Sequence, residues 1–142
     1  MSFEDLPTGW PSQSLIDPNL AADVVDLCCS LRDRENNSLA LLLCDEQGRL
    51  VQPICLEQLP SAPDEGAARQ LGRLLSELPI HGTLVAAFGR PGAYLDDDTR
   101  AWHQAMIEAG RMASVQLLGC YLATPQRVVR LAGPGERAEI AV

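Results

Sequence analysis

The chain has 142 residues, of which 46% are hydrophobic and 21% are charged, and its formal net charge is −8 at pH 7. This length predicts one domain that buries a core without disulfide or metal staples. The charge argues against a nucleic-acid binder, because 11 basic residues are spread among 19 acidic ones and phosphate binding depends on clustered basic side chains. No segment approaches the roughly 18 consecutive apolar residues of a membrane helix, and the acidic start, Met1 to Asp5, is unlike a signal peptide. We therefore expect a cytoplasmic protein that does not contact membranes.

Cysteines suggest neither a disulfide framework nor a zinc site. There are five of them, an odd number, and most lie in apolar stretches: Cys28, Cys29, Cys44, Cys55 and Cys120. No Cys-x-x-Cys pair occurs, and two adjacent cysteines would point to different faces of a helix. We expect reduced thiols that pack as small hydrophobic side chains, and we expect no cofactor.

The sequence contains a clear start signal for the first helix. Residues 1–16 have no hydrophobic period and predict an extended N-terminal arm that Trp10 anchors. Asp17 is a suitable N-cap and Pro18 suits the first helical position. Apolar residues then recur at helical spacing, namely Leu20, Val24, Leu27, Cys28 and Leu31. This pattern predicts one helix that ends near Asn36 and Asn37.

A hairpin is predicted next. Residues 38–44 are apolar on both faces, which is typical of a strand covered on both sides, although period alone also permits a short buried helix. The turn residues 45–48 end in Gly48, which suits a positive φ, and residues 50–56 form the returning strand. Pro53 cannot donate to a ladder, so this second strand should lie at an edge or carry a bulge.

The middle of the chain predicts a helix, a strand and a second helix. Residues 67–78 have an amphipathic helical period that Pro79 stops, and residues 83–88 form a short buried strand. The loop that follows ends in residues 96–98, three aspartates that would lie at the positive end of the next helix. That helix carries an apolar stripe of Trp102, Ala105, Met106, Ala109, Met112 and Ala113, with His103 turned away from it to solvent.

The C-terminal part predicts a second hairpin, with residues 115–123 and 128–131 as its strands and residues 124–127 as its turn. Helices alternate with strands along the whole chain. We therefore expect an α/β fold in three layers, an α/β/α sandwich with a mixed sheet. Its single domain spans residues 17–132, and residues 133–142 form a flexible tail.

Several of these segments carry a family resemblance. They are the run from Leu39 to Leu50, the strand that starts at Gly82, and the join of residues 108–111 to residues 115–118. Together with Pro91 after the central strand, they resemble the RadC-like branch of the JAB/MPN metalloprotease-type domains. This resemblance implies a cytidine-deaminase-like α/β/α sandwich.

The resemblance also implies where a zinc site would lie. In the family, a His-x-His-Pro sequence ends the central strand, and an aspartate at the start of the next helix completes the metal site. Pro91 matches this pattern. The two histidine positions fall on Phe88 and Arg90, and the aspartate position falls on Thr99.

Ligand chemistry turns these differences into a functional prediction. A catalytic zinc needs about three protein ligands and an open water position, whereas Arg90 would repel the ion. Asp97 or Asp98 can take the aspartate position if the register slips, and such aspartates hold at most a weak magnesium ion. The family's glutamate falls near Asn37, and Glu35 is close to this position but out of register. We expect no catalytic residue and no zinc hydrolysis.

The remaining candidates have weak chemical support. No nucleophile or orienting carboxylate is spaced for His81, and no serine lies in a hydrolase turn. Arg90 flanked by aromatic residues resembles an interaction hot spot, although Phe88 and Trp102 have the spacing of core residues. The candidate binding surface consists of Arg90, Pro91, Tyr94, Asp96, Asp97 and Asp98.

The sequence therefore predicts a non-catalytic protein-interaction or regulatory module with an unknown protein partner. Homo-oligomers are a further expectation, because the edge strand around Pro53 or the terminal hairpin can pair with a second copy. The alternative is a small-ligand-binding protein or a hydrolase-type enzyme that reuses the cleft around Arg90 and residues 96–98. A role in DNA repair rests on the family name alone, and the acidic charge counts against it.

Overall fold

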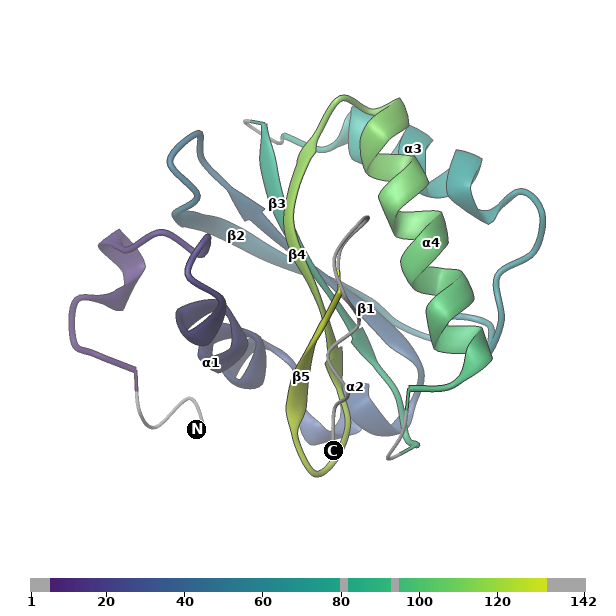
Figure 1. Ribbon diagram of the computed structural model, residues 1–142, viewed down its shortest axis with the longest axis horizontal. Helices are drawn as coiled ribbons and strands as arrows, with labels where there is room; N and C mark the ends of the chain where they lie inside the picture. The colour runs from purple at the N-terminus through teal and green to yellow at the C-terminus, as the bar shows by residue number, and fades with distance from the viewer. Residues whose placement is uncertain (1–5, 80–81, 93–94, 133–142) are drawn as a thin grey trace.

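A computed structural model describes residues 6–79, 82–92 and 95–132 (Figure 1). These residues form one five-stranded sheet in the order β2-β1-β3-β4-β5, in which β3 and β4 are parallel and the other neighbours are antiparallel. The predicted mixed α/β architecture is confirmed. In chain order the elements are η2 (Trp10–Ser12), α1 (Pro18–Cys28), α2 (Leu31–Glu35), β1 (Ser38–Cys44), β2 (Leu50–Leu56), α3 (Ala67–Glu77), β3 (Thr83–Gly89), α4 (Asp97–Met112), β4 (Gln116–Ala123) and β5 (Val128–Leu131).

Helices cover both faces of the sheet, as Figure 1 shows. The central strands β1 and β3 are buried along their whole length, so their alternating side chains supply two cores. Leu41 and Phe88 face the core under α3 and α4, whereas Leu42 and Val85 face the core under α1. The apolar runs of the sequence that form β1 and β3 are therefore strands and not buried helices, because each strand contributes side chains to a core on both of its faces.

The predicted single helix of residues 18–37 is wrong in one respect. The chain breaks at Cys29 and Ser30 and starts the short helix α2 there. Ser30 accepts a hydrogen bond from the backbone N–H of Asp33 at 3.1 Å, and the Asp33 carboxylate accepts one from the N–H of Ser30 at 3.2 Å. This reciprocal capping box was readable in the sequence and marks a new helix start.

The predicted hairpins are confirmed, and Pro53 lies on β2 at an edge of the sheet. The N-terminal arm is less extended than predicted. It contains the turn η2, and the fully buried Leu15 anchors it more deeply than the half-buried Trp10. The predicted tail, residues 133–142, lies outside the described residues. Within the described ranges, no helix is long and apolar enough to cross a membrane.

Candidate functional site

Phe88 and Arg90, which the predicted resemblance aligns with two histidines, lie two residues apart at the end of β3. Phe88 is 1% exposed and packs in the core under α3 and α4. Arg90 follows two residues later, and it is only 7% exposed. Gly89 between them has no room for a side chain, because an added Cβ would lie 2.7 Å from the Asp33 carbonyl oxygen and even closer to the Ser38 hydroxyl. The strand therefore ends in close contact with α2.

Arg90 joins three segments of the chain. Its backbone N–H donates to the Ala123 carbonyl at 3.0 Å, which fixes the end of β3 against β4. Its guanidinium donates through Nη1 to the Ser61 carbonyl oxygen at 2.9 Å. On the other side, Nη2 lies 3.9 Å from Oδ2 of Asp96. The positive charge thus points at partners within the protein.

Asp96 connects this arginine to the start of α4. It is the N-cap of α4, and its Oδ1 accepts a hydrogen bond from the backbone N–H of Thr99 at 2.7 Å. Partial burial raises the pKa of the Asp96 carboxyl. The Thr99 hydroxyl, the Thr99 N–H and the charge of Arg90 together lower this pKa by more than burial raises it, so it lies below its usual value. The carboxyl is therefore ionised at neutral pH.

Thr99 is the residue that the predicted resemblance aligns with a metal-binding aspartate. It is completely buried. Its hydroxyl makes no hydrogen bond of ordinary geometry, although it lies close enough to Asp96 to help lower the pKa of that carboxyl. The structure thus brings Arg90 and Thr99 together through Asp96, and it places Phe88 in the core on the same side of the sheet.

Trp102 lies on the next turn of α4 and contacts the loop before α3. Its indole Nε1 donates to the Pro60 carbonyl oxygen at 3.1 Å, and its ring is buried in the core beside α3. The neighbouring carbonyl, that of Ser61, binds Arg90. The loop before α3 is thus held at two consecutive carbonyl groups, one bound by Arg90 directly after β3 and the other by Trp102 of α4. Both aromatic residues predicted to be core, Phe88 and Trp102, are buried.

Three other residues of the candidate binding surface are described, and Asp98 among them is half-buried. Pro91 is exposed. The side chain of Asp97 is 98% exposed, and its carboxylate lies 3.1 Å from Nη1 of Arg100. Tyr94, like His81, lies outside the described residues. Among the residues that are described, no group of three or more His, Cys, Asp or Glu side chains could hold a metal ion.

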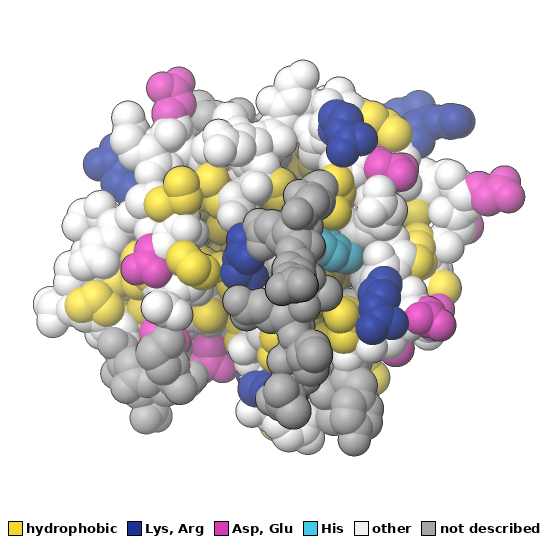
Figure 2. Space-filling model, viewed as in Figure 1, with side chains coloured by type: hydrophobic (Ala, Val, Ile, Leu, Met, Phe, Trp, Pro, Cys, Tyr) yellow, Lys and Arg dark blue, Asp and Glu magenta, His cyan; other side chains and the backbone are white. Residues whose placement is uncertain are grey.

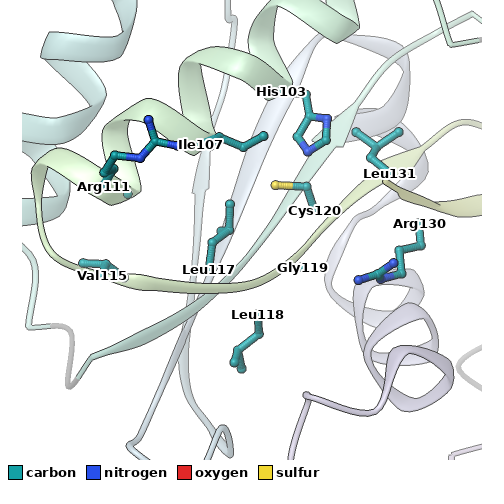
Figure 3. A pocket seen from close by; sticks show the side chains of 11 residues that line it. His103, Ile107, Arg111, Val115, Leu117, Leu118, Gly119, Cys120, Arg130 and Leu131 are labelled. Atoms are coloured by element: carbon teal, nitrogen blue, oxygen red, sulfur yellow. The ribbon is translucent and has the colours of Figure 1, made fainter. Parts of the chain in front are cut away.

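A second site, which the sequence analysis missed, lies between α4 and the strands β4 and β5 (Figure 3). It is a cavity of about 280 Å³. The expectation that His103 faces solvent is wrong, because this side chain is half-buried in the cavity wall and its burial lowers its pKa. The signal was present in the sequence. His103, Ile107 and Arg111 recur every four residues and so share one face of the helix.

The chain was compared with known proteins. No protein-family model matches it, and no curated protein sequence matches it.

Proposed function

We propose that this protein is a non-catalytic, RadC-like member of the JAB/MPN domains with a cytidine-deaminase-like fold, used for protein interaction or regulation. In this proposal a buried arginine replaces the metal as the cation that holds the site together. The observation that carries it is the position of Arg90, whose guanidinium lies between the Ser61 carbonyl and the Asp96 carboxylate with only 8% of its side chain exposed.

The ligand chemistry supports the loss of zinc. A zinc ion requires nitrogen, sulfur or carboxylate ligands at about 2.0 to 2.3 Å. Phe88 offers none, and Arg90 brings a charge that repels the ion. Asp96 reaches the arginine, but its other oxygen already caps α4 through Thr99. An arginine at this point satisfies the carboxylate that a metal would otherwise neutralise, so the residues fit a structural ion pair better than a zinc site.

The order of the elements supports the fold assignment. The sequence patterns predict a hairpin, a helix, a strand, a helix and a second hairpin, and the chain forms these elements in that order. Pro91 directly follows the end of β3. Residues 108–111 lie near the end of α4 and residues 116–118 lie at the start of β4, so the join that carried the resemblance connects a helix to a strand.

The experiment measures zinc by mass spectrometry in protein purified without added metal, before and after dialysis against zinc. We expect far less than one zinc per chain in both samples. Stoichiometric zinc, removed by Asp97→Asn with Asp98→Asn, would overturn the proposal.

The alignment of this chain with the family's metal ligands is tested separately, by restoring those ligands with Phe88→His, Arg90→His and Thr99→Asp. A folded triple variant, checked by near-ultraviolet circular dichroism, should bind one zinc per chain, and a folded variant that binds none contradicts the family assignment.

The alternative, a ligand site that uses Arg90 as its anion-binding residue, has less support. The guanidinium is buried and already donates to the Ser61 carbonyl. An incoming anion would have to break this hydrogen bond and displace Asp96. The cavity between α4 and β4 is better suited to a ligand, and it is independent of this site.

A further inference from the structure

The second cavity arises where the sheet loses its regular pairing. Strand β5 pairs with β4 only from Cys120 to Ala123. Just before this point the register of β4 against β3 shifts, so that Leu84 pairs with Leu117 but Val85 pairs with Gly119. Leu118 is therefore an extra residue, a β-bulge that bends the strand. In the described part of the chain, no strand pairs with the outer edge of residues 116–119, and the cavity opens there beside α4.

The walls of the cavity combine an apolar body with positive charge. Ile107 of α4, Leu117 of β4 and Leu131 of β5 form apolar parts of the wall, and Arg111 and Arg130 line it from different elements (Figure 3). None of the lining residues in the described part of the chain is acidic, although the chain has 19 acidic residues and a net charge of −8. Hydrophobic side chains are also visible between charged ones on the face that Figure 2 shows. This local reversal of charge favours an anionic ligand.

The two groups that resemble catalytic residues are not activated. Burial raises the pKa of the Cys120 thiol to about 12, although the charge of Arg130 acts in the opposite direction. Burial also lowers the pKa of His103, so its ring is neutral at pH 7. A protonated thiol is a poor nucleophile. The cavity is therefore equipped to bind a ligand and not to attack one.

The size of the cavity limits the ligand. A cavity of about 150 Å³ holds one benzene molecule, and this one has about 280 Å³. We propose that the cavity between α4, β4 and β5 binds a small carboxylic acid with an apolar body of about two fused rings, with Arg111 as the main partner of the carboxylate. Arg130 adds positive charge on the side of β5, where it also contacts the Tyr121 hydroxyl. This proposal does not depend on whether the chain has lost a zinc site.

The test uses 2-naphthoate as the probe and 2-naphthamide as its uncharged isostere, titrated into the full-length ¹⁵N-labelled protein. We expect saturable binding of one naphthoate per chain, with amide shifts concentrated in residues 103–111 and 115–120. The amide should bind at least tenfold more weakly. Equal affinity of acid and amide, or no saturable binding of the acid to the wild-type chain, would overturn the proposal.

Variants separate the charge from the apolar wall. Arg111→Gln should weaken naphthoate binding at least tenfold, whereas the control Arg100→Gln on the same helix should not change it, because Arg100 pairs with Asp97 outside the cavity. Ile107→Trp should block binding by filling the cavity. Unchanged affinity in Arg111→Gln refutes the assigned role of this residue. Binding that appears only after Glu136→Gln with Glu139→Gln would show that the chain's own C-terminal residues occupy the cavity, which also overturns the proposal.

Discussion

Replacement of Arg90 by methionine tests whether this residue holds the site together. Methionine keeps most of the apolar stem but removes the charge and the donors. The variant loses the 2.9 Å hydrogen bond to the Ser61 carbonyl and the 3.9 Å approach to Asp96. It keeps the backbone hydrogen bond to Ala123, because that bond uses the main-chain N–H.

The magnitude follows from these two interactions. A hydrogen bond from a charged donor stabilises a protein by about 1.5 to 3 kcal/mol. The ion pair adds less than about 1 kcal/mol, because the Asp96 side chain is 55% exposed. Part of this loss is offset, since the variant no longer has to bury a guanidinium. We therefore expect Arg90→Met to lower the free energy of unfolding by about 2 kcal/mol, and Arg90→Ala to lower it by about 3 to 4 kcal/mol because two buried methylenes are also lost.

The assay is equilibrium unfolding in urea at pH 7, with thermal melting as a second measurement. For a protein of this size, 2 kcal/mol corresponds to a decrease of about 4 to 8 °C in Tm. The matched control is Arg100→Met, which should change stability by less than about 0.5 kcal/mol because its ion pair with Asp97 is exposed. If Arg90→Met is as stable as this control, the guanidinium does not hold the loop to α4, and the structural role proposed for it is wrong.

Three further predictions concern other parts of the fold. Gly89→Ala should destabilise the protein by several kcal/mol because its Cβ would collide with the backbone of α2, whereas Gly92→Ala, with open space around it, should be nearly neutral in urea unfolding. Arg34→Met should cost about 3 to 5 kcal/mol, since the buried guanidinium binds three carbonyl groups and a carboxylate; the exposed Arg32→Met is its control, and equal melting temperatures would contradict this reasoning. The lowered pKa of His103 means that the unfolded chain takes up a proton first as the pH falls below about 6.5, so stability decreases toward acid. His103→Gln should flatten this part of the stability curve, and an unchanged slope would show that the ring is not desolvated.

The sequence by itself determined the elements, because each one has a local cause. Period-2 and period-3.6 patterns, the aspartates before α4 and the turn at Gly48 depend only on neighbouring residues. They gave the strands and the later helices within a residue or two. The break between α1 and α2 was missed although its cause is equally local, since the capping box of Ser30 and Asp33 lies within an otherwise continuous helical pattern.

The burial and the charge partners of single residues could not be predicted from their sequence neighbours. Arg90 looked like a surface cation in the sequence, and it is buried because the carbonyl of Ser61, 29 residues away, and the carboxylate of Asp96 converge on it. His103 looked solvated on its helix, and it is half-buried in the wall of the cavity between α4 and β4. Burial and charge partners depend on segments that are distant in sequence, and no local pattern encodes which of them meet. The tertiary structure alone therefore decided that one basic side chain is enclosed by the fold and that another, Arg111, lines a cavity.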